Sequence, residues 1–292
     1  MIAVRARDLV LLIGITFIWG VNLIISKVGV NEIPPILFTF LRFAIVTIIL
    51  IPVLRIHPGQ MRTLTIAALL SGALNFALSF AGLRRATNVA SVAIITQLGV
   101  PFATLLSVAM LGEVVRWRRR TGIALSFLGV IVLGFDPQIG DRWESVAMLV
   151  SAAFFGALGL IIVKRLQGFT PAELLGWTCL ISLPGLLMAS LVLEQPNLSD
   201  WSVVSWQAWG SLFFAAVVAS LIAHTGYFHL VQRYPVTSVA PLTTLSPVFS
   251  IALGVLLLGD KLTPRIIIGG LCTLIGVLII TLRERRIVDT GT

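Results

Sequence analysis

Amide, hydroxyl and aromatic side chains recur inside otherwise apolar stretches of this sequence. The candidate ligand-binding side chains are Trp19, Asn22, Arg42, Asn75, Phe76, Ser79, Gln97, Trp177, His224, Tyr227, Thr244 and Ser246. Amides and hydroxyls that converge on one cavity can bind the ammonium and carboxylate groups of a zwitterion, and aromatic rings can form apolar walls. The residue types therefore favour noncovalent binding of a small amphipathic molecule.

Each of these groups also has a structural interpretation. Hydroxyls in apolar helices commonly bond to carbonyls of their own helix or bridge two helices. Arg42 lies well inside the apolar stretch that begins at Pro34, too deep to reach the interface easily. It either anchors a substrate carboxylate or bonds to helix-end carbonyls and polar neighbours, and we favour the second role. For the amides and His224 both interpretations stay open.

The usual residue sets for covalent or metal chemistry are not found in the sequence. There is no Ser-His-Asp set, no cluster with metal-ligand spacing and no Gly-rich nucleotide loop, and the two cysteines, Cys179 and Cys272, lie in apolar stretches. There is also no ring of charges or filter-like repeat of the kind that channels use. We therefore expect neither an enzyme nor a channel, and no resident cofactor or metal.

Ten apolar stretches must position these residues. We expect membrane-spanning helices over 8–28, 34–54, 63–83, 88–111, 118–135, 144–165, 171–193, 205–231, 236–258 and 264–282. A hydrocarbon core about 30 Å thick needs about 20 helical residues to cross it. Hydrophobic residues make up 58% of the chain and charged residues only 11%. The apolar runs lack the alternation of barrel strands, so the sequence predicts an all-α integral membrane protein without a soluble domain.

The net charge of +9 is divided unevenly between the two predicted sides of the membrane. Fourteen basic residues fall on the side of the amino terminus, namely Arg5, Arg7, Arg55, Arg62, Arg116, Arg118, Arg119, Arg120, Lys164, Arg165, Arg233, Arg283, Arg285 and Arg286. Six fall on the other side, namely Lys27, Arg84, Arg85, Arg142, Lys261 and Arg265. This positive-inside bias places both termini in the cytoplasm and the protein in the inner (plasma) membrane. It also explains the basic charge without nucleic acid.

The two halves of the chain resemble each other. Over 89–135 and 236–282, at a constant offset of 147, 15 of 47 positions are identical, and Gly112-Glu113 matches Gly259-Asp260. A weaker match, with a gap of one residue, relates Trp19-Gly20 and Lys27 to Phe155-Gly156 and Lys164. Five helices per half is an odd number, so the second half must enter the membrane inverted.

Inverted repeats are a transporter architecture with the substrate site near the midplane. We therefore predict two five-helix repeats, 1–137 and 138–292, around a central cavity. The carboxylates Glu113, Glu144, Glu173 and Asp260 lie at or near helix ends, and none lies in the interior of a predicted span. Since proton-coupled carriers often use buried acids, this favours facilitated diffusion by alternating access.

Prolines and small residues indicate where the helices bend and pack. Pro101, Pro241 and Pro247 should kink or break the fourth and ninth spans, as hinges or as fixed kinks. Small residues line one face of the fifth span and one of the tenth: Gly122, Ser126, Gly129, Gly269, Thr273 and Gly276. Such faces allow close helix contact, which we assign to the scaffold. We expect a monomer, with a homodimer through such a face as the alternative.

The Trp19-Gly20-Val21-Asn22 turn that leads to Lys27, Arg42 in the second span, and the Gly-acid links of both halves carry a family resemblance. Together they resemble the drug/metabolite transporter superfamily, in its ten-helix EamA-type family and especially its aromatic amino-acid exporters. The resemblance implies the same inverted bundle, a central cavity and export of amino acids or similar metabolites. Anionic metabolites, nucleotide-sugar-like solutes and proton-coupled drug or metabolite efflux are the alternatives.

Overall fold

The computed structural model describes residues 5–136, 142–196, 204–234 and 242–282. These residues form helices joined by short turns and loops, and no strand occurs among them. The structure therefore agrees with the all-α prediction. Pro241 and the predicted start of the ninth span, at residue 236, lie outside the described residues.

The helices follow the predicted spans closely. The first three spans are α1 (Ala6–Glu32), α2 (Pro35–Leu50) with a 3₁₀ turn at Ile51–Val53, and the run α3 (Met61–Ala68), η2 (Leu69–Leu74) and α4 (Asn75–Arg85). The fourth to seventh are α5 (Val89–Thr96) with α6 (Gly99–Leu111), then α7 (Trp117–Gly134), α9 (Trp143–Val163) and α10 (Pro171–Ala189) with η3 (Ser190–Glu194). The last three are α11 (Trp206–Phe213) with η5 (Phe214–Ile222) and α12 (Ala223–Arg233), then α14 (Leu245–Leu258) and α15 (Pro264–Leu282).

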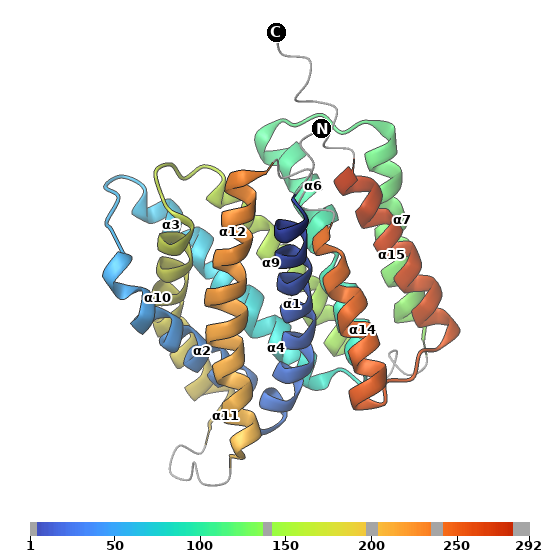
Figure 1. Cartoon of the computed structure of the whole chain (residues 1–292), viewed down its shortest axis with the longest axis horizontal. Coiled ribbons are helices and arrows are strands. Elements are labelled where there is room, and N and C mark those ends of the chain that lie inside the picture. Colours follow the sequence, from blue (N-terminus) through green and yellow to red (C-terminus); the bar gives the residue numbers. More distant parts are fainter. Residues whose placement is uncertain (1–4, 137–141, 197–203, 235–241, 283–292) are drawn as a thin grey trace.

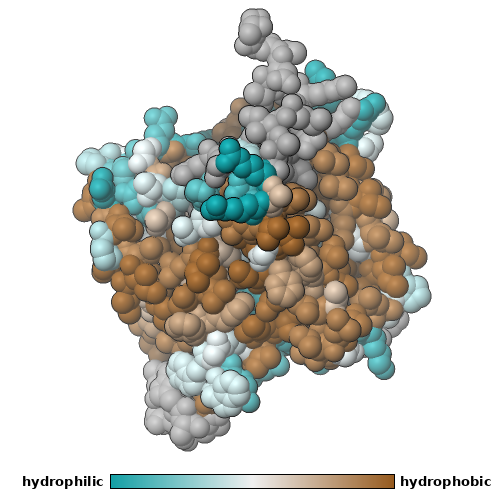
Figure 2. All heavy atoms as spheres, in the orientation of Figure 1, coloured by the Kyte–Doolittle hydropathy of each residue, from teal (hydrophilic) through white to brown (hydrophobic). Residues whose placement is uncertain are grey.

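Eight of these helical spans are long and apolar enough to cross a membrane. The other two are α7, which has 18 residues but three arginines in its first turns, and α14, which has 14 described residues. On the face shown in Figure 2, a broad apolar band crosses the molecule, with hydrophilic residues above and below it. Large apolar side chains such as Ile48, Leu256 and Leu193 are exposed on these helices, which is the arrangement that a lipid environment favours.

The two links that the repeat relates lie at opposite ends of the bundle. In Figure 1, α1 begins and α15 ends at the upper edge, and the 112–116 link lies at this same edge. The 259–263 link, between α14 and α15, lies at the lower edge. Gly112 and Gly259 both end their helices with a positive φ of 70°, a conformation that costs glycine little.

The small-residue faces of α7 and α15 pack on each other. Ser126 Oγ donates to the carbonyl of Thr273 (3.5 Å), and Thr273 Oγ1 donates to the carbonyl of Ser126 (3.4 Å). A methyl group at Gly122 would lie 2.8 Å from the carbonyl oxygen of Gly276. The two helices therefore run antiparallel, and the face that we considered for a homodimer is covered within one chain.

Several other pairs of spans also pack symmetrically in the two halves. The first span packs against the ninth and the eighth, while the sixth packs against the fourth and the third. The second and seventh spans pack on each other, as do the fifth and tenth. The first span corresponds to the sixth, the second to the seventh, and so on. When each span in a pair named here is exchanged for its counterpart, the result is again a pair that packs together.

Carboxylates at helix starts bind the amide groups that lack a partner within the helix. Glu173 and Thr170 form a capping box at α10, and Glu194 accepts from the amides of Ile36 (2.7 Å) and Leu37 (3.0 Å) at the start of α2. A negative charge at a helix amino terminus interacts favourably with the helix dipole. Binding of helix-start amides therefore gives Glu173 and Glu194 a structural role.

Candidate functional site

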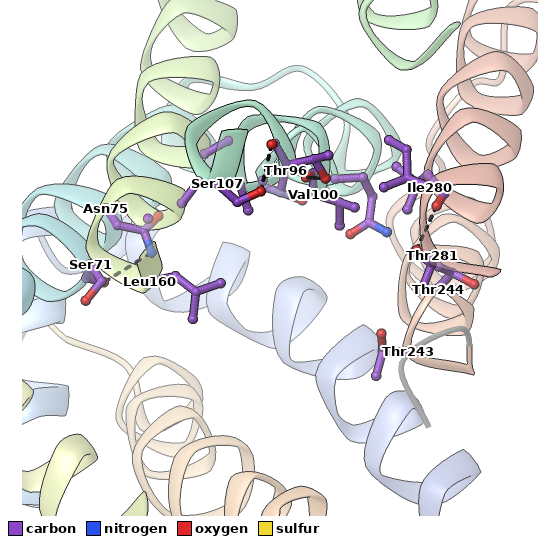
Figure 3. A pocket seen from close by; sticks show the side chains of 18 of the residues that line it. Ser71, Asn75, Thr96, Val100, Ser107, Leu160, Thr243, Thr244, Ile280 and Thr281 are labelled. Carbon is purple, nitrogen blue, oxygen red and sulfur yellow. Dashed lines mark hydrogen bonds between the residues drawn. The ribbon is translucent and has the colours of Figure 1, made fainter. Parts of the chain in front are cut away.

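A cavity of about 770 Å³ lies between the third, fourth and sixth spans on one side and the eighth, ninth and tenth on the other. Figure 3 shows Ser71 and Asn75, Thr96 and Ser107, and Thr243 and Thr244 on different helices around it. Glu113, Arg119 and Lys164 lie at its mouth, and the side chains of Glu113 and Lys164 are 43% and 50% exposed. The mouth is thus at the end of the bundle that holds the 112–116 link.

The fourth and ninth spans are each interrupted at a residue that lines the cavity. The fourth span is interrupted at Gln97 and Leu98, between α5 and α6, and the ninth is interrupted at Thr244, just before α14. A proline clashes with the carbonyl four residues before it, and Pro101 stands four residues after Gln97. The break in the fourth span was thus predictable from the proline, and the interruption before Pro247 places Thr244 at the cavity as well.

Five of the twelve predicted binding residues line this cavity: Asn75, Ser79, Gln97, Tyr227 and Thr244. The side chain of Gln97 makes no hydrogen bond to any described residue, so both ends of its amide are available to a ligand. Asn75 donates to the carbonyl of Ser71 (3.2 Å), and its oxygen faces Ser79 Oγ at 3.4 Å. The two amides come from different spans of the same half and approach the cavity from separate walls.

Hydroxyl groups around the cavity largely satisfy their donors within their own helices. Thr96 donates to the carbonyl of Val92 (3.0 Å), Thr104 to Val100 (3.0 Å) and Ser107 to Thr104 (2.9 Å). Their oxygens retain acceptor capacity, which suits an ammonium or amide donor of a ligand. Thr104 and Ser107 were not among the predicted residues, although Thr104 follows Gln97 by seven residues and Ser107 follows Thr104 by three, spacings that place them on one helical face.

Tyr227, which lines the cavity, belongs to an aromatic cluster with Trp19 and His224. The Trp19 ring lies 5.1 Å from the His224 ring and 5.4 Å from the Tyr227 ring. Trp19 Nε1 donates to the carbonyl of Ala219 (3.3 Å), and His224 Nδ1 lies 2.8 Å from the same oxygen. Trp19 and His224 therefore position Tyr227 and are not among the cavity-lining residues.

Arg42 and Phe76 lie beside the cavity and do not line it. The Arg42 guanidinium is buried and donates through Nε (3.1 Å) and Nη2 (2.9 Å) to Ser220 Oγ. It also lies over the rings of Phe76 and Phe80, at 5.1 and 5.6 Å from their centroids. These contacts join the second, third and eighth spans, in keeping with the structural role that we favoured.

Three other predicted residues lie away from the cavity wall. The Asn22 oxygen faces Ser26 Oγ at 3.4 Å on the same helix, and the carbonyl of Ser246 accepts from Ser250 Oγ (3.2 Å). Trp177 donates through Nε1 to the carbonyl of Arg55 (2.9 Å), near the loop between the second and third spans. A helical face can be predicted from spacing, but its neighbours depend on how the helices pack.

Neutral polar groups surround the deeper part of the cavity. Apart from Tyr227, the ionisable lining residues are the three at the mouth, Glu113, Arg119 and Lys164. No group of three His, Cys, Asp or Glu side chains that could hold a metal ion occurs in the part of the chain that the structure describes. Amides, hydroxyls and one phenol can orient a polar solute.

Helices long and apolar enough to cross a membrane, packed around a polar cavity, suit a membrane transporter of small molecules. A family model, the EamA-like transporter family, matches residues 7–135 and again residues 142–282. The chain therefore belongs to the EamA-like transporter family, as the resemblance in its sequence indicated.

Relatives and a solved structure match along nearly the whole chain. A probable amino-acid metabolite efflux pump of Escherichia coli is 29% identical over 98% of this chain and 99% of its own length. A protein of the same description from Salmonella typhimurium is 27% identical over 94% of each chain. A crystal structure with 20% identity has a TM-score of 0.64 and covers 97% of this chain and 99% of its own, which shows a shared fold.

Proposed function

We propose that this transporter exports amino acids, including large apolar and aromatic ones, and related small metabolites from the cytoplasm. The observation that carries the proposal is the deep cavity wall, where the amides of Gln97 and Asn75 meet hydroxyl groups without a fixed charge. Such groups suit a zwitterion, which brings both charges itself and needs donors and acceptors in balance. The efflux pumps to which the chain is similar add support.

The transport cycle that we propose is alternating access by two inverted halves, 1–137 and 138–292, within a monomer in the inner membrane. Support comes from the antiparallel contact of α7 with α15, from the exchangeable packing of the spans, and from the double match of the family model. The mouth of the cavity lies beside the arginine-rich 112–120 segment. By the positive-inside rule we infer that this end faces the cytoplasm, and we therefore propose that the structure is an inward-open state.

Counterflow in proteoliposomes tests the proposed function. Vesicles preloaded with unlabelled phenylalanine or leucine should accumulate the labelled amino acid transiently and saturably, and an imposed pH gradient should not change the accumulation. A dependence on the pH gradient would replace facilitated diffusion with proton coupling. Uptake of an anionic metabolite without any uptake of amino acids would favour the alternative substrate class, and absence of all counterflow would contradict a carrier.

We also propose that the broken fourth and ninth spans bend when the cavity changes sides, with Pro101 and Pro247 as hinges. Pro101→Ala restores a backbone donor opposite the carbonyl of Gln97 and should extend α5 into α6. We expect slower turnover in counterflow at unchanged protein level in the membrane. Unaltered turnover would make the break a fixed kink.

A further inference from the structure

The end of the bundle opposite the cavity mouth is held by Lys27, on α1. Its ammonium donates to three carbonyl oxygens at the carboxyl end of α4, those of Leu83 (2.6 Å), Arg84 (3.0 Å) and Ala86 (2.9 Å). An ammonium has three donors, and all three are satisfied here. A cation is also favourable at the negative end of a helix dipole. Lys27 thus fastens the first span to the third.

Asp260, in the link between α14 and α15, makes the complementary contact at the same end. Its Oδ2 accepts from the amides of Val89 (2.7 Å) and Ala90 (3.1 Å), the first two residues of α5. The carboxylate binds the positive end of that helix. Lys27 therefore joins the first span to the third, and Asp260 joins the link between the ninth and tenth spans to the fourth. We call this pair of contacts the outer lock.

Among the described residues, the corresponding side chains at the other end make no hydrogen bond to a helix terminus of the opposite wall. Lys164, just after α9, and Glu113, in the 112–116 link, line the open mouth with 3.8 Å between Nζ and Oε1. Both side chains are about half exposed, so this ion pair contributes little by itself. Within the described residues, the ammonium of Lys164 has no contact with a helix-end carbonyl.

The repeat relates these two pairs of residues. Glu113 follows Gly112 as Asp260 follows Gly259, at the offset of 147, and Lys164 follows Phe155-Gly156 as Lys27 follows Trp19-Gly20. The third span, whose end Lys27 binds, corresponds to the eighth. The residues that close one end of the bundle thus have counterparts that stand open at the other.

We propose that Lys27 and Asp260 hold the outer side closed, and that Lys164 closes the inner side by binding the carbonyls at the carboxyl end of α12 when the outer lock opens. The four charged residues are then positioning residues that set which side of the cavity is open. This inference rests on the proposed function, because it assigns the two locks to the two halves of one transport cycle.

Accessibility of a single cysteine tests the two locks without any substrate. Ser79 lines the cavity on α4, close to the end that Lys27 binds. In a background with Cys179→Ala and Cys272→Ala, we would measure labelling of Ser79→Cys by a membrane-impermeant maleimide in right-side-out and inside-out vesicles. The otherwise unchanged protein should label rapidly from the cytoplasmic side and slowly from the outer side.

Lys27→Gln removes the charge-assisted bonds of the outer lock and should raise outer labelling about tenfold. Asp260→Asn should act in the same direction, while Lys27→Arg, which keeps a cation with several donors, should stay near the parent rate. Lys164→Gln is the matched control, because it weakens the inner lock and should leave outer labelling at or below the parent rate.

An unchanged outer rate in both Lys27→Gln and Asp260→Asn would overturn the proposal, as would an equal increase in Lys164→Gln, which would indicate general loosening. If Lys27→Gln fails to reach the membrane, the outer labelling rate of Asp260→Asn is compared with that of Lys164→Gln instead, and the same criteria apply. If Lys27→Gln raises outer labelling and Lys164→Gln does not, but no amino acid shows counterflow, the proposed locks stand and the proposed substrate is wrong. If amino acids show counterflow but the labelling rates do not change, the proposed substrate stands and the proposed locks are wrong.

Discussion

Alanine at Gln97 should lower amino-acid counterflow by about tenfold or more, since a hydrogen bond to a charged partner contributes about 1.5–3 kcal/mol. Gln97 stands at the break between α5 and α6 and lines the cavity. Its amide is free of bonds to the described residues, so the substitution removes ligand contacts and leaves the helix packing unchanged. The amount of protein in the membrane should therefore stay near that of the wild type.

Asn75→Ala should act in the same direction with a smaller effect, because one amide donor already binds the carbonyl of Ser71. Gln60→Ala is the matched control, since Gln60 bonds to Gln167 in a loop outside the cavity. Wild-type counterflow in Gln97→Ala would remove this residue from the binding site. An equal loss in Gln60→Ala would show that the assay reports a general effect on folding.

A methyl group at Gly129 or at Gly276 should destabilise the bundle by about 1–3 kcal/mol, the usual cost of overpacking. These glycines are equivalent in the two repeats and lie on the packed faces of α7 and α15. An added Cβ at Gly276 would meet the carbonyl oxygen of Gly122 at 2.6 Å, and one at Gly129 would meet the amide of Thr273 at 2.6 Å. In lipid, close packing is a main source of helix association, so separating the two backbones should lower the apparent melting temperature.

Gly134→Ala provides the control, because Gly134 ends the same helix with nothing within 4 Å of an added Cβ. Melting in detergent, followed by the monomer peak in size-exclusion chromatography, would measure all three variants. We expect both Gly129→Ala and Gly276→Ala to melt at lower temperature, with Gly134→Ala unchanged. Stability of Gly129→Ala equal to that of Gly134→Ala would contradict the close contact of α7 with α15.

Much of the helical framework was predictable because lipid imposes simple rules on a sequence. The apolar runs gave the spans to within a few residues, and Pro101 indicated a break near Gln97. The offset of 147 also paired Ser126 with Thr273, the two residues that exchange hydrogen bonds in the structure. These features depend on helix length, backbone chemistry and repetition, which are all local or internal properties of the chain.

Which residues line the cavity was harder to predict, because this depends on how each helix is rotated about its axis relative to its neighbours. The spacing of Trp19, Asn22 and Ser26 is that of one helical face, yet none of the three lines the cavity. Arg42 meets Ser220 in a widened π-helical turn, whose register the sequence does not specify. Thr104 and Ser107 continue the face of Gln97 beyond the break, where regular spacing gave a usable but overlooked signal.

The proposed transport cycle requires two halves that cross the membrane in opposite directions. Reporter fusions after residues 116 and 262 would measure this directly, because one reporter is active only in the cytoplasm and a second only outside it. We predict that the 112–116 link is cytoplasmic and that the 259–263 link is external. Both links on the same side of the membrane would contradict the inverted arrangement and, with it, the alternating cavity.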